Sequence, residues 1–147
     1  MTIKSELQVI NSLKYFILTT ISGLILPFIL LPIIKVTGYS EIIEELAKML
    51  IVLLLVLRIP NNRYRIIVSI IFGLLFGLSE SILYLNNIFH VGDMAVFWNR
   101  LLLTVPLHIV TVLVILLPAL KNKKLIILGY ILALIIHYLF NYLIYYI

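Results

Sequence analysis

The sequence predicts an all-α integral membrane protein, built as one bundle of about five membrane-spanning helices. Hydrophobic residues make up 64% of the 147 residues, against roughly 45–50% in soluble domains. Apolar stretches of about 20 residues recur along the chain, and each is long enough to cross a hydrocarbon core of roughly 30 Å. No linker, repeat or low-complexity segment divides the chain. We therefore expect a single membrane domain over residues 1–147.

The individual helices follow from the apolar stretches, which short polar connections separate. The first stretch contains Pro27 and Pro32 and is about 20 residues long, which exceeds the apolar region of a typical signal peptide. We therefore expect it to be retained as a helix. The predicted spans are residues 15–34, 40–57, 66–85, 96–120 and 125–147.

The basic residues indicate how these spans are oriented. Placing the N-terminus in the cytoplasm and the C-terminus outside leaves only Lys35 among the loop cations on the outer side, as the positive-inside rule requires. The net charge of +5 therefore reports topology, and we expect no nucleic-acid partner. The cations expected on the inner side are Lys4, Lys14, Arg58, Arg63, Arg65, Lys121, Lys123 and Lys124.

Polar side chains inside the predicted spans collect in the outer half of the membrane. A rise of 1.5 Å per residue places them about 6–18 Å below the outer boundary, on four helices that alternate in direction. A charge inside a membrane costs roughly 2.5–3.5 kcal/mol, so such residues are candidates for function first. The candidate site residues are Glu44, Glu45, Glu80, His108, His137 and Asn141.

Other polar residues have simpler structural interpretations. Glu41 is expected to form an interfacial salt bridge, and Arg100 to extend its charged group toward the outer interface. His90 and Asp93 are expected in a solvated connection. A ridge of small residues at four-residue intervals should let another helix approach closely. This small-residue ridge consists of Ser69, Gly73, Gly77 and Ser81.

A buried cluster of carboxylates and imidazoles supports three kinds of chemistry: hydrolysis by activated water, binding of a divalent cation, or proton relay. The sequence excludes several hydrolase classes. It contains no cysteine and no H-E-x-x-H or G-x-S-x-G motif. Its single aspartate, Asp93, rules out an aspartate pair. Any hydrolysis must therefore depend on glutamate and histidine.

Four short patterns in series resemble the PrsW family of intramembrane proteases, within the clan of CAAX prenyl endopeptidase-like proteins. They are "EELAK" with Glu44, Glu45 and Lys48, "FGLSE" with Glu80, an isolated helical His108, and "HYLFN" with His137 and Asn141. The family pattern is E-E-x-x-K, F-x-x-x-E, a helical His and H-x-x-x-N/D on successive helices. All four patterns occur in this order across residues 44–141.

The resemblance implies roles for the candidate residues. Glu44 would be the general base that activates water, and Glu45 would support it or bind Lys48. Glu80 and His108 would hold the water or a metal, His137 would be a metal ligand, and Asn141 would stabilise the oxyanion. The resemblance leaves open whether zinc takes part or the glutamates act without metal.

The resemblance also implies a substrate and a location. Family members cleave membrane-anchored proteins such as anti-sigma factors near the outer membrane face, which suits a prokaryotic plasma membrane with the site on the extracytoplasmic side. PrsW-type proteins usually have more spans, so self-association into a homo-oligomer is one way to supply missing helices.

Two other functions stay open. One is a non-catalytic scaffold, like the related subunit of gamma-secretase, and the other is a small proton- or cation-coupled transporter.

Overall fold

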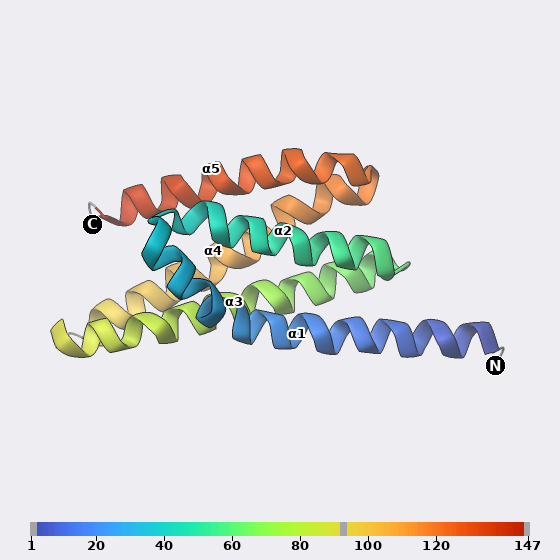
Figure 1. The fold of residues 1–147 in the computed structure, drawn as a ribbon, viewed down its shortest axis with the longest axis horizontal. Helices are drawn as coiled ribbons and strands as arrows, with labels where there is room; N and C mark the ends of the chain where they lie inside the picture. The colour runs from blue at the N-terminus through green and yellow to red at the C-terminus, as the bar shows by residue number, and fades with distance from the viewer. Residues whose placement is uncertain (1–2, 92–93, 146–147) are drawn as a thin grey trace.

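Five long helices run alongside one another in the computed structural model, which describes residues 3–91 and 94–145 (Figure 1). The predicted all-α fold class is confirmed. A single 3-10 turn, η1 at Lys123–Leu125, precedes the last helix. The helices are α1 Ile3–Thr37, α2 Ser40–Arg58, α3 Asn62–Val91, α4 Met94–Lys121 and α5 Ile126–Tyr145.

Several helices extend beyond the predicted apolar spans. α3 continues to Val91, through most of the polar segment that we expected as a connection, and α1 begins at Ile3. The predicted spans end where hydropathy falls, but a helix continues through polar residues until the backbone conformation changes. At the end of α1 this change occurs at Gly38, whose φ of 75° suits glycine and whose N–H donates to the Ile34 carbonyl. Asp93 and the side chain of His90 lie outside the described residues.

Four segments among the described residues are long and apolar enough to cross a membrane: Ile10–Thr37, Asn62–Leu85, Phe97–Lys121 and Lys123–Ile144. These segments belong to α1, α3, α4 and the stretch from η1 through α5. The remaining helix, α2, carries the charged "EIIEELAK" segment and does not meet that composition. Four helices therefore identify the chain as an integral membrane protein. Helix α2 differs from them because its composition alone does not predict a membrane span.

The exposed and buried faces of α2 show how it can still cross a membrane. Its charged side chains Glu44, Glu45 and Lys48 are all buried. Its 19 residues extend about 28 Å, close to the thickness of a hydrocarbon core. The outward face is apolar, which suits contact with lipid. The large exposed side chains on it are Ile42, Leu46, Leu50 and Leu57.

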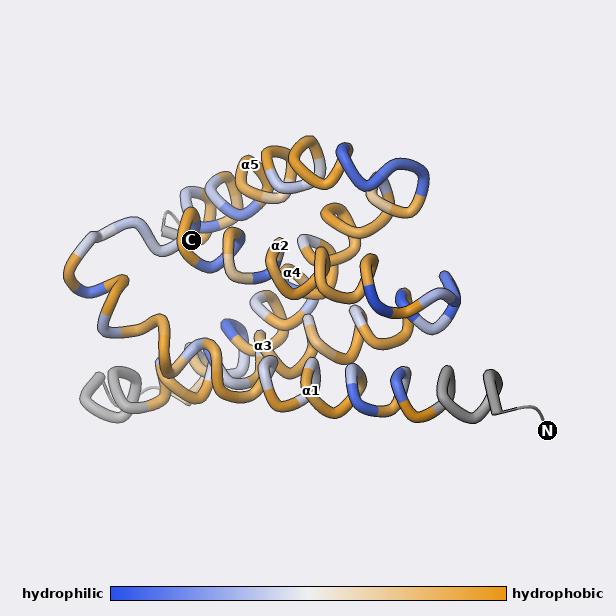
Figure 2. Tube along the Cα trace, turned by 45° about the vertical axis from the view of Figure 1, so that its right-hand side comes forward, coloured by the Kyte–Doolittle hydropathy of each residue, from blue (hydrophilic) through white to orange (hydrophobic). Residues whose placement is uncertain are grey.

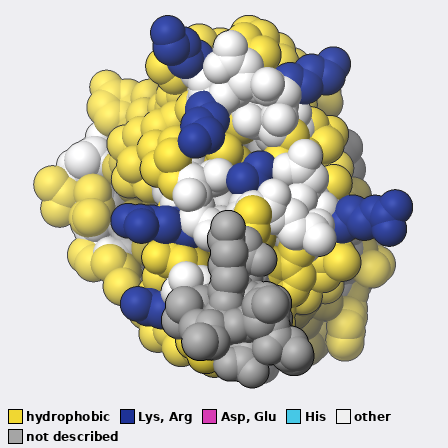
Figure 3. Space-filling view, turned by 90° about the vertical axis from the view of Figure 1, so that its right-hand side faces the viewer, with side chains coloured by type: hydrophobic (Ala, Val, Ile, Leu, Met, Phe, Trp, Pro, Cys, Tyr) yellow, Lys and Arg dark blue, Asp and Glu magenta, His cyan; other side chains and the backbone are white. Residues whose placement is uncertain are grey.

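The start of α1 and the end of α5 lie at opposite ends of the bundle (Figure 1). The connections from α2 to α3 and from α4 to η1 lie at the same end as the N-terminus. Both connections are hydrophilic in the hydropathy colouring (Figure 2). Seen from this end, Lys and Arg side chains ring the apolar bundle, and no Asp or Glu is visible outside the grey residues (Figure 3). This distribution supports the predicted orientation, which itself remains a prediction.

The small-residue ridge on α3 packs against α4, as the sequence predicted. A Cβ on Gly73 would lie 2.8 Å from the backbone oxygen of His108, and one on Gly77 would lie 2.8 Å from Cα of Val105. Both separations are shorter than real Cβ contacts. Glycine at these two positions is therefore what lets α4 come close enough to bring His108 to α3.

Candidate active site

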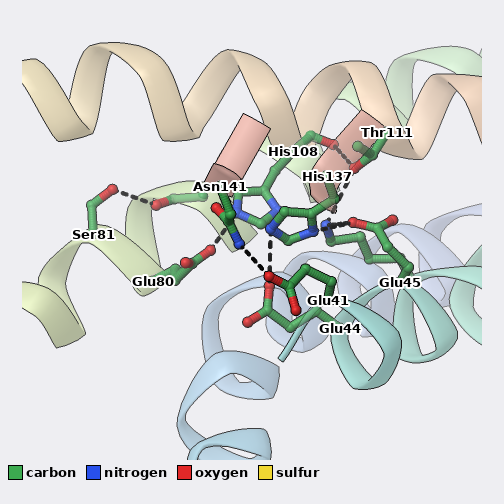
Figure 4. A network of polar contacts seen from close by, with 11 residues as sticks. Glu41, Glu44, Glu45, Glu80, Ser81, His108, Thr111, His137 and Asn141 are labelled. Carbon is green, nitrogen blue, oxygen red and sulfur yellow. Dashed lines mark hydrogen bonds and ion pairs between the residues drawn. The ribbon is translucent and has the colours of Figure 1, made fainter. Parts of the chain in front are cut away.

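Four helices contribute polar side chains to one buried cluster in the membrane domain (Figure 4). α2 provides the most, α3 provides Glu80, α4 provides His108 and α5 provides His137. His108 is fully buried, and 2% of the His137 surface is exposed. Candidates from α2, α3, α4 and α5 therefore meet in the structure, although Glu44 and His137 are 93 residues apart in the sequence.

Glu45 is the centre of one half of the cluster. Its Oε1 accepts from Lys48 Nζ at 2.6 Å and lies 2.7 Å from Nδ1 of His137. Lys48 also donates to Oγ1 of Thr111 at 3.2 Å. An ionised carboxylate can only accept hydrogen bonds. If Glu45 is ionised, Nδ1 of His137 must therefore carry the proton and donate it to this bond. In the neutral imidazole, Nε2 then carries the free lone pair.

Glu44, Glu80 and His108 form the other half of the cluster. One ligand atom from each residue lies within 4.8 Å of those of the other two. Nε2 of His108 contacts Oε2 of Glu80. Oε2 of Glu44 and Nδ1 of His108 are buried without a hydrogen-bond partner among the described residues. Buried polar atoms left in this state usually face an ion or water.

His137 connects the two halves. Its Nε2 lies 4.0 Å from Oε2 of Glu44, and its ring stands edge-on to that of His108 with centroids 5.4 Å apart. The resemblance had implied that His137 is a metal ligand and that Glu44 is the base. Those roles stay predictions; in the structure Glu44 lies in one group with His108 and Glu80, and Nδ1 of His137 lies against Glu45.

Asn141 lies one turn beyond His137 but binds a different carboxylate. Its Nδ2 donates to Oε1 of Glu41 at 2.8 Å, and the hydroxyl of Ser40 donates to Oε2 of Glu41 at 3.1 Å. The salt bridge that we expected for Glu41 is therefore absent among the described residues, because Lys48 points to Glu45 instead. The Asn141–Glu41 bond joins the first turn of α2 to the last part of α5.

Apolar packing surrounds His108 and Lys48 on the side of α3. The ring of Phe76 lies 5.0 Å from the His108 ring, measured between centroids, and 4.9 Å from Nζ of Lys48. A Cβ on Gly77 would come within 3.2 Å of Cδ2 of His108. Phe76 and Gly77 are neighbours on α3, so one turn of this helix both shields the lysine and positions the imidazole.

Comparison with known protein families matches residues 16–147 to the PrsW family intramembrane metalloprotease. The chain belongs to the PrsW family. Comparison with curated proteins and with solved structures gives no match. The matched range includes all five helices except the first part of α1, so every residue of the buried cluster lies within it. At the level of the family, the chain is an intramembrane protease and hydrolase that acts in a lipid bilayer on a protein substrate.

A metal fits the PrsW cluster by the chemistry of its donors. Two carboxylates and one imidazole are ligands that zinc takes in proteins, and catalytic zinc sites have three protein ligands with a further position open. Glu44, Glu80 and His108 provide these donors within 4.8 Å of one another. The unpartnered Oε2 of Glu44 supports the same interpretation.

A cavity of about 270 Å³ gives access to the cluster of this PrsW-family chain. It lies between α1, α2 and α3, and its wall includes both Glu44 and Glu80. The rest of its lining is largely apolar and comes from α1, from Ser40 at the start of α2, and from the part of α3 that follows Glu80. The carboxylates of Glu44 and Glu80 therefore border the cavity on the side of the bundle where α1 lies.

Sequence reasoning missed several residues around the site. Thr111 looked like an ordinary helical threonine, and its contact with Lys48 spans 63 residues. Arg100 was expected only to reach the interface, yet its guanidinium carbon lies 3.6 Å from the ring centroid of Tyr84. Tyr84 in turn lines the cavity together with Pro27. A proline inside an apolar helix was the one visible signal that α1 shapes this opening.

Proposed function

We propose that this protein is an endopeptidase that hydrolyses a peptide bond of membrane-anchored proteins within the outer half of the bilayer. The observation that carries the proposal is the juxtaposition of Glu44, Glu80 and His108 with His137, whose Nε2 is not committed to the Glu45 bond. The cavity beside Glu44 and Glu80 supplies the space for a peptide and a water molecule.

The metal-binding group in this proposal is Glu44, Glu80 and His108. Zinc bound there would polarise the scissile carbonyl and lower the pKa of a water molecule toward neutrality. The short separations among the three donors support this set over the one that the resemblance implied, in which His137 stood in place of Glu44. The same set explains why these polar atoms are buried without partners.

His137 is the proton carrier in this proposal. Nδ1–H of His137 donates a hydrogen bond to Glu45 and keeps its proton. Nε2 is therefore the ring nitrogen that can accept a proton, and it lies 4.0 Å from Oε2 of Glu44. Nε2 takes a proton from the attacking water and returns it to the nitrogen of the leaving amine. Glu45 and Lys48 hold the imidazole in this orientation and act through it. Asn141 fixes the outer end of α5 through Glu41.

The charge distribution supports the orientation in this proposal, and the family supports its substrate class. Basic side chains gather at the end with the N-terminus, so that end is assigned to the cytoplasm of a prokaryotic cell. The cluster then lies toward the extracytoplasmic side of the plasma membrane. Membrane-anchored regulators, such as anti-sigma-factor-like proteins, are the substrate class that fits a site at that depth.

The proposal is tested with purified protein reconstituted in liposomes with a fluorescent reporter that carries a transmembrane anchor. Glu80→Gln and His137→Gln should each lower turnover by at least about a hundredfold, the usual contribution of acid–base groups. Tyr138→Phe is the matched control, since Tyr138 follows His137 on α5 and is 61% exposed. Full turnover by Glu80→Gln would contradict catalysis and favour the scaffold function, in which an amide can replace the carboxylate.

A further inference from the structure

The cavity beside the cluster has a wall that suits an apolar side chain. Pro27, Leu31 and Ile34 of α1 face Leu83 of α3 across it, and the carboxylates lie on the wall that α2 and α3 share. Its volume is about 270 Å³. An apolar cavity of roughly 150 Å³ already holds a benzene molecule. The space therefore accepts one large aliphatic or aromatic side chain, although not a folded domain.

The path of α1 keeps this cavity open. α1 contains Pro27 and Pro32, and a proline inside a helix removes a backbone hydrogen bond and bends the helix. Figure 1 shows the last part of α1 leaving the straight course of its first part and turning toward the start of α2. The lining residues Leu31, Ile34 and Lys35 all follow Pro27 along α1. The cavity thus lies where α1 departs from the bundle.

Two cations border the cavity at its outer end. Lys35 lines the cavity, is exposed, and lies in the last turn of α1. It makes no ion pair or hydrogen bond within the described residues. The guanidinium of Arg100 lies over the ring of Tyr84, another lining residue. The carboxylates Glu44 and Glu80 also line the cavity, but neither forms an ion pair with Lys35.

We infer that the cavity selects substrates with a large apolar residue beside the scissile bond and an acidic residue just outside it, where Lys35 binds the carboxylate. This inference rests on the proposed function and adds a substrate class to it. An unpaired lysine near the membrane surface attracts a carboxylate, and a partner that supplies one gains a charge-assisted bond. The apolar residue enters the cavity and brings its peptide bond to Glu44 and Glu80.

The acidic part of the inference is tested by charge reversal in reconstituted liposomes. Anchored reporters carry Asp, Gln or Lys at each of several positions outside the scissile bond. Wild type should cleave the best Asp reporter roughly two- to fivefold faster than its Gln counterpart, the range for an exposed ion pair. Lys35→Glu should reverse the order and cleave the Lys reporter faster. An unchanged order, or an equal loss on all reporters, would overturn the inference.

The apolar part is tested by filling the cavity. Leu31→Trp should slow cleavage of reporters with Leu or Phe beside the scissile bond more than those with Ala. Ile33→Trp is the control, because Ile33 lies on the same helix and is 47% exposed outside the cavity lining. Equal slowing of the Leu and Ala reporters by Leu31→Trp would overturn this part. If wild type cleaves no anchored reporter at all, the proposed function fails, and not only its specificity.

Discussion

The ion pair between Lys48 and Glu45 gives the sharpest prediction of stability. Nζ and Oε1 are 2.6 Å apart, and both side chains are fully buried. At an effective dielectric constant of about 20, two charges at that separation attract by about 6 kcal/mol, part of which offsets the cost of removing both from water. Lys48→Met keeps the apolar stem but leaves Glu45 without its cation. The free energy of unfolding should fall by about 3–5 kcal/mol.

A double variant separates the charge effect from the loss of packing. Glu45→Gln/Lys48→Met removes both charges, so it should recover most of the stability that Lys48→Met loses. Reversible unfolding in mixed micelles measures all three proteins. Leu46→Met, on the lipid-facing side of α2, is the control and should change stability by less than about 0.5 kcal/mol. The reasoning is refuted if Lys48→Met is as stable as wild type. It is also refuted if the double variant is no more stable than Lys48→Met.

Three further variants test how the helices hold the site. Gly77→Ala should cost about 1–3 kcal/mol and lower turnover, because its Cβ would lie 2.8 Å from the α4 backbone beside His108. Thr111→Val should cost about 1 kcal/mol and leave turnover nearly unchanged, since Lys48 keeps its carboxylate partner. Asn141→Ala should cost about 1–3 kcal/mol, because it leaves the Glu41 carboxylate without its amide donor.

Unfolding in mixed micelles and cleavage of the anchored reporter measure these three effects as well. Leu74→Ala on the exposed face of α3 is the control for Gly77→Ala, and Leu139→Ala on α5 is the control for Asn141→Ala. If Gly77→Ala is as active as wild type, the close contact of α3 and α4 does not position His108. If Asn141→Ala matches its control, the bond to Glu41 does not hold α5.

The meeting of polar residues from separate helices could be predicted from sequence because helix rise is fixed. Counting residues put Glu44, Glu80 and His137 at similar levels of their helices, and the structure brings these side chains together. The small-residue ridge was equally predictable, since Gly73 and Gly77 leave room that a neighbouring helix fills. Both predictions depend only on the geometry of a single helix.

The pairing of the polar groups could not be predicted, because it depends on how each helix is rotated about its own axis. Spacing within α2 fits Lys48 to either Glu44 or Glu45, and only the position of α5 selects Glu45. The bond between Glu41 and Asn141 joins residues 100 positions apart. The cavity could not be predicted either, because it depends on the bend in α1 and no sequence motif marks it.

Binding of Co²⁺ as a spectroscopic probe tests most directly whether side chains from separate helices form one metal-binding centre. The purified chain should bind Co²⁺ with a visible spectrum of low symmetry, and Glu44→Gln, Glu80→Gln and His108→Gln should each abolish or weaken it. His137→Gln should still bind the ion, because His137 is assigned to proton transfer. A wild type that binds no Co²⁺, or binding that His137→Gln removes and Glu44→Gln preserves, would contradict the assignment.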